Sequence, residues 1–247
     1  MKKFFVFTFF ASTLAINSQA QFKNILKKDS SGKSGISKII QKTTSSSSLS
    51  NDEIVQGLKE ALSVGANNAS KQLSFVDGFF KDAAIKILMP PEAVKAEKKL
   101  RSLGMGKLVD DAILSMNRAA EDASKNAAPI FVNAIKQMSI QDAVGILRGN
   151  DTAATGYLKN KTTSPLTEAF RPVIETSLAK VNATKYWNTV FSTYNKFSSD
   201  KINPDLAAYV TEKSLSGIFH QVGLEEQKIR KDPMARTTDI LKKVFAK

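Results

Sequence analysis

The chain has 247 residues and a formal net charge of +13, and it contains no cysteine and one histidine, His220. The missing cysteine excludes a disulfide framework, a zinc–thiolate site, an iron–sulfur cluster and a thiol nucleophile. Any catalysis by a serine–histidine pair would have to use His220. The hydrophobic content of 42% and the charged content of 24% are ordinary for a globular protein that has a core of its own.

Residues 1–20 are predicted to be a secretory signal peptide. A short positive segment, an apolar run over residues 4–16 and small residues ending at Ala20 follow one another in the order that such peptides have. As a helix the apolar run would span only ~20 Å, short of the ~30 Å hydrocarbon core of a bilayer. We therefore expect an exported protein, periplasmic or secreted after cleavage near Ala20, with no transmembrane segment in the mature chain.

Residues 21–49 are predicted to be a disordered tether, because they are rich in serine and lysine. Residues 21–50 contain six lysines and one acid, whereas residues 51–247 contain 28 bases and 22 acids. The folded part is therefore only mildly basic, and we expect no nucleic-acid binding. The tether is either a solvated leader or a basic segment that makes peripheral contact with an anionic membrane.

Residues 50–247 are expected to form an all-α domain. Ser50 and Glu53 have the spacing of a capping box, and apolar residues then recur at helical intervals. Almost every later break is a capping residue or a proline at the first helical position. We expect a single compact domain of about ten helices, although a split near Gly149-Asn150 remains open. The expected helices cover 50–73, 79–89, 91–103, 107–126 and 129–138, and further ones begin after Ser139, Asp151, Ser164, Asn182, Asn203 and Asp232.

The C-terminal stretch holds the candidate ligand- or partner-binding residues Arg230, Arg236 and Glu226. Glu226 and Arg230 are four residues apart with the acid first, the favoured order on a helix. Arg230 and Arg236 flank a helix–proline–helix corner, where two guanidinium groups can hold a carboxylate or phosphate. The alternative is a structural role, in which the arginines pair with neighbouring acids of the chain.

Three other features have simpler interpretations. His220 has no acidic neighbour at helical spacing, so we expect a surface histidine rather than a general base. The glycines of 104–107 lack the spacing of a phosphate loop, and a helix end followed by a helix start explains them. Asp111 and Asp122 share a helix face but lie ~16 Å apart, too far for one metal ion or one acid–base pair.

The aromatic residues around Trp187 are expected to form ordinary core, with an apolar ligand pocket as the alternative. The set comprises Tyr186, Trp187, Phe191 and Tyr194. No cofactor or metal site is expected anywhere in the chain.

Four stretches resemble an uncharacterised family of exported bacterial proteins, domain-of-unknown-function family 4197. They are residues 85–92, 142–155, 209–219 and 225–245, the last reading EEQKIRKDPMARTTDILKKVF. The resemblance covers roughly residues 50–247. It implies an exported helical domain, and it supplies neither an assigned activity nor catalytic residues.

These observations favour a non-enzymatic, exported bacterial protein that binds a partner protein or a small anionic or apolar ligand. One alternative is an envelope-acting hydrolase whose two carboxylates are brought ~5–9 Å apart by the fold. Another is a protein that associates with the membrane surface through its basic tether.

Overall fold

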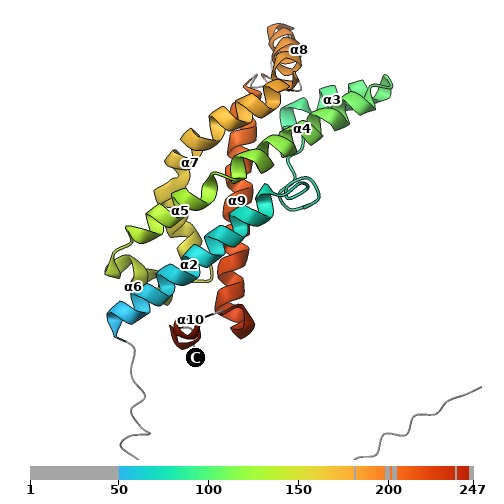
Figure 1. Cartoon of the computed structure of the whole chain (residues 1–247). Coiled ribbons are helices and arrows are strands. Elements are labelled where there is room, and N and C mark those ends of the chain that lie inside the picture. Colours follow the sequence, from blue (N-terminus) through green and yellow to red (C-terminus); the bar gives the residue numbers. More distant parts are fainter. Residues whose placement is uncertain (1–49, 181, 198–200, 202–204, 237, 245–247) are drawn as a thin grey trace, which may run out of the picture. The chain divides into compact units, whose positions relative to one another are not determined.

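The long helix α9 (Leu206–Lys231) packs against the three other long helices of the fold. The computed structural model describes residues 50–180, 182–197, 201, 205–236 and 238–244. The predicted signal peptide and the predicted tether lie outside these residues. Figure 1 shows α9 running alongside the three other long helices, which are α2 (Asn51–Ser74), α4 (Gly106–Ser124) and α7 (Ala153–Lys180).

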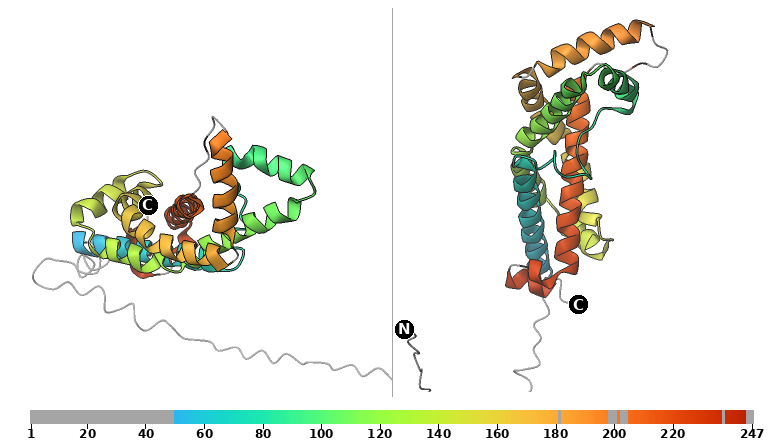
Figure 2. Two further views of the ribbon diagram at one scale, coloured as in Figure 1. Left: turned by 90° about the horizontal axis from the view of Figure 1, so that it is seen from above. Right: turned by 90° about the vertical axis from the view of Figure 1, so that its right-hand side faces the viewer.

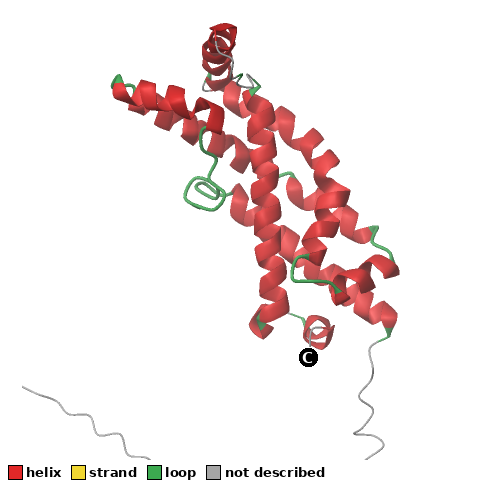
Figure 3. Cartoon of the chain, turned by 180° about the vertical axis from the view of Figure 1, so that it is seen from behind, coloured by secondary structure: helices red, strands yellow, loops and turns green. Residues whose placement is uncertain are grey.

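Helices account for nearly all the regular structure, and the described part of the chain has no strand (Figure 3). The prediction of an all-α fold is confirmed. Within the described ranges, no helix has both the length and the apolar character needed to cross a membrane. The remaining elements are α3 (Val94–Ser102), α5 (Ala127–Lys136), α6 (Ile140–Arg148), α8 (Ala183–Phe197), α10 (Asp239–Val244) and two short 3-10 turns, Pro91–Ala93 and Pro233–Ala235.

Two helix starts follow directly from local sequence. The Glu53 backbone N–H donates to the Ser50 hydroxyl over 3.2 Å, and the Glu53 carboxylate accepts from the Ser50 N–H over 2.8 Å. Ser139 and Asp142 form the same reciprocal pair at the start of α6, over 3.1 and 3.0 Å. The predicted capping box at Ser50 is confirmed, and the helix predicted to begin after Ser139 starts with the same kind of box.

The predicted helix over residues 79–89 is wrong, because this segment is a loop of turns and extended backbone. Side chains of α4 accept its backbone N–H groups. Glu121 accepts from Phe79 and Phe80 over 3.1 and 3.3 Å. Asn117 accepts from the Ile87 N–H over 2.9 Å and donates to the Ile87 carbonyl over 2.8 Å. These long-range bonds replace the bonds that a helix would have made.

The predicted break before Pro165 is also wrong, since α7 continues through both Pro165 and Pro172. Both prolines are exposed, so the carbonyls that lose an N–H partner lie on the solvent side. The buried face continues unbroken past them, and its burial offsets the lost hydrogen bonds. One helix therefore replaces two, and the predicted count of about ten helices is not supported. The buried face consists of Ala154, Leu158, Thr162, Leu166, Phe170, Ile174 and Leu178.

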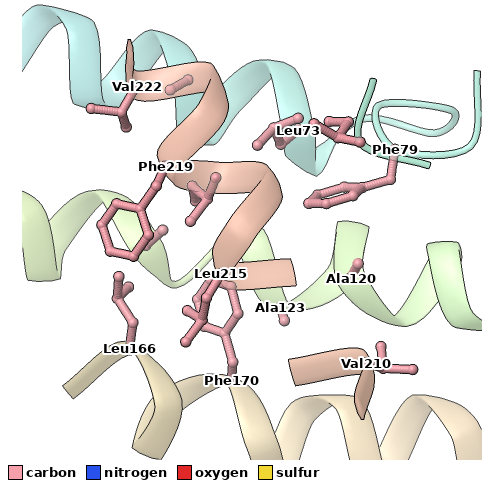
Figure 4. Close-up of a cluster of buried hydrophobic side chains, with 14 of the residues drawn as sticks. Leu73, Phe79, Ala120, Ala123, Leu166, Phe170, Val210, Leu215, Phe219 and Val222 are labelled. Atoms are coloured by element: carbon pink, nitrogen blue, oxygen red, sulfur yellow. The ribbon is translucent and has the colours of Figure 1, made fainter. Parts of the chain in front are cut away.

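Residues Leu49–Lys247 form one compact unit, so the chain does not split near Gly149-Asn150. Helices from before and after this point share a core, in which α9 packs on α2 and α7 packs on α4. Figure 4 shows Leu73, Ala123, Phe170 and Phe219 meeting in it. The Phe219 ring also meets Phe131 edge-on, with centroids 5.9 Å apart.

Candidate functional site

An apolar groove lies beside the N-terminal end of α9. It is bounded by the loop before α3, by α3 and α4, and by α8, which Figure 2 shows at the same end of α9 as α3. Its volume is about 520 Å³, within the range of small-molecule sites. Apolar side chains form most of its wall, and they are Met89, Ala93, Ala96, Leu100, Leu108, Val109, Ala112, Leu114, Met116, Ala183, Trp187, Phe191 and Leu206.

Trp187 and Phe191 of α8 form an aromatic wall of the groove. They are one turn apart, their ring centroids lie 4.3 Å apart, and the rings are tilted by 51°. Both side chains are almost fully buried and belong to the main hydrophobic core. Trp187 and Phe191 are therefore part of the core and also border an apolar pocket, so both interpretations given for these aromatic residues apply to this pair. The side chains of Tyr186 and Tyr194 lie outside the described part of the structure.

The loop that carries Met89 into the groove is held on two sides. Asn117 of α4 bonds to both backbone groups of Ile87, and the Tyr209 hydroxyl of α9 donates to the Leu88 carbonyl over 2.9 Å. Burial raises the pKa of the Tyr209 phenol to about 12, so the hydroxyl keeps its proton at neutral pH. These bonds fix the wall of the groove before any ligand binds.

Charged side chains of the groove lie in ion pairs. Glu97 pairs with Arg101 over 2.9 Å, and Asp111 pairs with Lys107 over 2.8 Å. Arg118 bonds to Glu121 over 2.6 Å and to Asp77 over 2.7 Å, and these carboxylates, Glu121 first, raise the pKa of its guanidinium. The charge lining the groove is thus largely compensated within the chain.

The two serine hydroxyls that line the groove also have partners. Ser115 donates to the Ala112 carbonyl over 2.8 Å, as serines on helices often do. Ser177 donates to the Asp122 carboxylate over 3.0 Å. With charges and hydroxyls already bonded, the surface offered to a ligand is chiefly hydrocarbon.

The predicted site residues Glu226 and Arg230 lie at the opposite end of α9. The Glu226 carboxylate, 4% exposed, accepts from the backbone N–H groups of Ala154 and Thr155 over 3.0 and 2.8 Å. It therefore caps the N-terminus of α7 from another helix, where a negative charge is favourable. Arg230, 13% exposed, donates to Glu226 over 2.8 Å and to the Ile146 carbonyl of α6 over 2.9 Å.

Arg236 bonds to the end of α9. Its guanidinium donates to the Ile229 carbonyl over 3.1 Å and to the Arg230 carbonyl over 3.0 Å, groups that a helix end leaves without intrahelical partners. The crevice beside Glu226 and Arg230 has a volume of only about 10 Å³. The contacts match the structural alternative, and ligand or partner binding by these three residues stays a prediction. We refer to Glu226, Arg230 and Arg236 as the C-terminal corner.

The other residues considered from sequence are dispersed. His220 is exposed on α9. Gly104 has φ = 78° between α3 and α4, as a helix end requires, so the glycine pair joins two helices. In the part of the chain that the structure describes, no three histidine, aspartate or glutamate side chains gather as a metal site. Glu121, on the same helix as Asp111 and Asp122, is buried and bonded to the loop 79–90.

Sequence reasoning did not identify the contribution of α3 and α4 to the groove. Val109, Ile113 and Met116 form part of the buried stripe of α4. Leu108 and Ala112 widen that stripe and line the groove. The sequence did contain one signal for the groove. Apolar residues cover a wider part of the α4 surface than packing against one neighbour requires, whereas a simple amphipathic helix has a single apolar stripe.

The comparisons with known proteins give one match. The family described as "Protein of unknown function (DUF4197)" matches residues 48–246. Neither a curated protein nor a solved structure matches the chain. Because the match covers most of the sequence, including the groove and the C-terminal corner, the chain belongs to the DUF4197 family.

Proposed function

We propose that this protein is an exported, non-enzymatic binding protein that takes up the hydrocarbon chain of an amphiphile in the apolar groove. The observation that carries the proposal is the groove itself, with its volume of about 520 Å³ and its wall of apolar side chains. Pockets of this size and lining are the usual sites for small apolar ligands.

Apolar area would supply most of the binding free energy in this groove. Each Å² of apolar surface removed from water contributes roughly 25 cal/mol, so a chain that covers the groove wall gains affinity without a polar contact. The wall is fixed by Asn117 and Tyr209, so little conformational entropy is lost on binding. A polar ligand would find few unbonded partners, because Ser115, Ser177 and the lining charges already have theirs.

Export is the second part of the proposal, and it rests on residues 1–20 alone. Their order of positive, apolar and small residues is that of a cleaved signal peptide. Expression of the full chain in a bacterium, followed by mass spectrometry of the envelope and medium fractions, should give a protein that begins at Gln21. An intact N-terminus in the cytoplasmic fraction would overturn this part.

The binding test uses Trp187, the one tryptophan of the chain. Bromine quenches indole fluorescence only at close range, so brominated stearate bound in the groove should quench Trp187 saturably. Unlabelled stearate should reverse the quenching by competition. Quenching that rises linearly without saturation, or that unlabelled stearate leaves unchanged, would contradict the proposal.

The hydrolase alternative would require two carboxylates free to act in a cleft. Glu121 and Glu226, two of the buried carboxylates, accept from backbone N–H groups and pair with Arg118 and Arg230. These contacts hold helices and a loop in place. No observation on the described residues favours this alternative over ligand binding in the groove.

A further inference from the structure

Helices α3 and α4 form a hairpin whose turn projects from the rest of the fold (Figures 1 and 2). We call residues 103–108 the hairpin tip. Gly104 turns the chain with φ = 78°, and a Cβ built there would meet nothing within 4 Å. The turn is therefore open to its surroundings rather than packed against another helix.

The tip exposes three large apolar side chains within six residues. Leu103 is 63% exposed, Met105 44% and Leu108 48%. Single exposed apolar side chains are normal on a protein surface, but a cluster at a projecting turn marks an interaction site. Leu108 also lines the apolar groove, so the tip and the groove adjoin.

Bases outnumber acids around this apolar tip. Residues 95–111 contain five bases, Lys95, Lys98, Lys99, Arg101 and Lys107, and three acids, Glu97, Asp110 and Asp111. Arg101 and Lys107 pair with Asp110 and Asp111 of α4. Lys98 and Lys99 are exposed and make no ion pair with a described residue.

We propose that the hairpin tip docks on the surface of an anionic lipid bilayer. Leu103, Met105 and Leu108 would enter the boundary between headgroups and acyl chains, while Lys98 and Lys99 meet the lipid phosphates. Apolar side chains beside lysines whose stems reach up to the headgroups are the combination that interfacial binding uses. The excess of bases selects an anionic surface rather than a neutral one, which favours a bilayer over an apolar protein patch.

Vesicle co-sedimentation of the chain from Gln21 onward tests this docking. Vesicles of phosphatidylglycerol and phosphatidylcholine should bind the protein, and vesicles of phosphatidylcholine alone should bind it much more weakly. The pair Leu103→Ser and Met105→Ser should lower the partition coefficient about tenfold, because their apolar side chains no longer enter the interface. The pair Lys98→Glu and Lys99→Glu should lower it about tenfold on anionic vesicles only, and added salt should reduce that difference.

Matched controls change exposed residues elsewhere. Ile140→Ser with Met234→Ser removes exposed apolar side chains, and Lys71→Glu with Lys159→Glu reverses exposed charges. Both control pairs should bind vesicles as the parent does. Circular dichroism should show the parent helix content in every variant, and a tip variant that loses it is replaced by Leu103→Gln, which is expected to give the same loss of binding.

Three results would overturn the docking proposal. One is parent-like vesicle binding by both tip variants, which would assign binding to the tether that all these proteins retain. The second is equal binding to neutral and anionic vesicles. The third is no binding by the parent, which would leave the tip to a protein partner. The Leu103→Ser and Met105→Ser variant should keep the stearate-dependent quenching of Trp187, so this proposal and the ligand-binding proposal can fail separately.

Discussion

The two ends of α9 use their side chains in different ways. At the C-terminal corner, Glu226 is buried against the start of α7, Arg230 is partly buried against the end of α6, and the crevice beside them measures about 10 Å³. At the other end, near Leu206, the helices leave an apolar groove of about 520 Å³. The charged cluster that stands out in the sequence holds helix ends together, whereas the space for a ligand lies among apolar residues.

The largest expected effect is at the C-terminal corner. Glu226→Ala should lower the free energy of unfolding by about 3–5 kcal/mol, because it leaves Arg230 and two backbone N–H groups of α7 buried without their partner. Urea denaturation followed by circular dichroism measures this. The exposed Glu212→Ala serves as control and should change stability by no more than about 0.5 kcal/mol. A similarly small loss in Glu226→Ala would break the comparison between the two ends.

The loop beside the groove should show the next largest effect. Asn117→Ala leaves the N–H and carbonyl of Ile87 unbonded, and it should cost about 1–3 kcal/mol of stability. It should also weaken stearate binding, because Met89 is held by the same loop. Asn67→Ala removes an exposed intrahelical bond of α2 and is the control in both assays. Unchanged binding in Asn117→Ala would mean that the loop does not shape the groove.

Filling the groove should block ligand binding without unfolding the protein. Ala112→Phe places a ring in space that the ligand would occupy, so stearate affinity should fall about tenfold, which is about 1.4 kcal/mol. Competition against brominated stearate, read through Trp187, gives the affinity. Ala179→Phe makes the same change at an exposed position of α7 and should bind as the parent does. Equal affinities in the two variants would place the ligand elsewhere.

Arg236 should contribute less to the free energy of unfolding than Glu226 does. Arg236→Ala removes two hydrogen bonds to the end of α9, and we expect a stability loss of about 1 kcal/mol. Stearate binding should stay at the parent level, because the groove lies at the other end of the helix. Arg148→Ala, at an exposed position, is the control. Loss of stearate binding in Arg236→Ala alone would connect the two ends and contradict their separate roles.

Stability should depend only weakly on pH in the alkaline range, through the phenol of Tyr209. Folding raises the pKa of Tyr209 to about 12, above its ordinary value near 10, so the folded state holds this proton more tightly. The free energy of unfolding should therefore fall as the pH rises above about 10. The two pKa values set a ceiling of about 1.4 kcal/mol at pH 11, and the partial exposure of the phenol to water should keep the fall below about 1 kcal/mol. In Tyr209→Phe, the free energy of unfolding should not show the part of this decrease that comes from the phenol. Parallel pH curves for parent and variant would show that the phenol does not titrate with folding.

Local sequence predicted the features that depend on a few neighbouring residues. The capping boxes at Ser50 and Ser139 need only a residue three positions away, and both formed. The amphipathic spacing gave the all-α class for the same reason, since a helix buries the face that its own period defines. The DUF4197 resemblance was confirmed as well, through motifs spread over the folded part.

The wrong predictions depend on distant partners. Residues 79–89 have a helical pattern, but Glu121 and Asn117 bond to their backbone from α4. Pro165 is typical of a helix start, but the buried face of α7 runs past it against other helices. The roles of Glu226 and Arg230 could not be predicted from sequence, because their partners on α7 and α6 come together only in the fold.

The sequence likewise indicated only part of the groove. Trp187 and Phe191 stood out as a possible pocket wall, but α3, α4 and the loop of Met89 supply the rest of it. Whether aromatic residues at helical spacing close a core or border a space depends on which helices pack across from them. That is a property of the packed structure, which one helix's own sequence does not contain.

The central claim is that the groove buries an apolar ligand, and titration calorimetry with laurate below its aggregation concentration tests it most directly. We predict saturable binding of one laurate per chain with a negative change in heat capacity, the mark of buried apolar surface. The heat should be greatly reduced in Ala112→Phe and retained in Ala179→Phe. Absence of a binding heat across several temperatures, or an Ala112→Phe titration identical to that of the parent, would contradict the account.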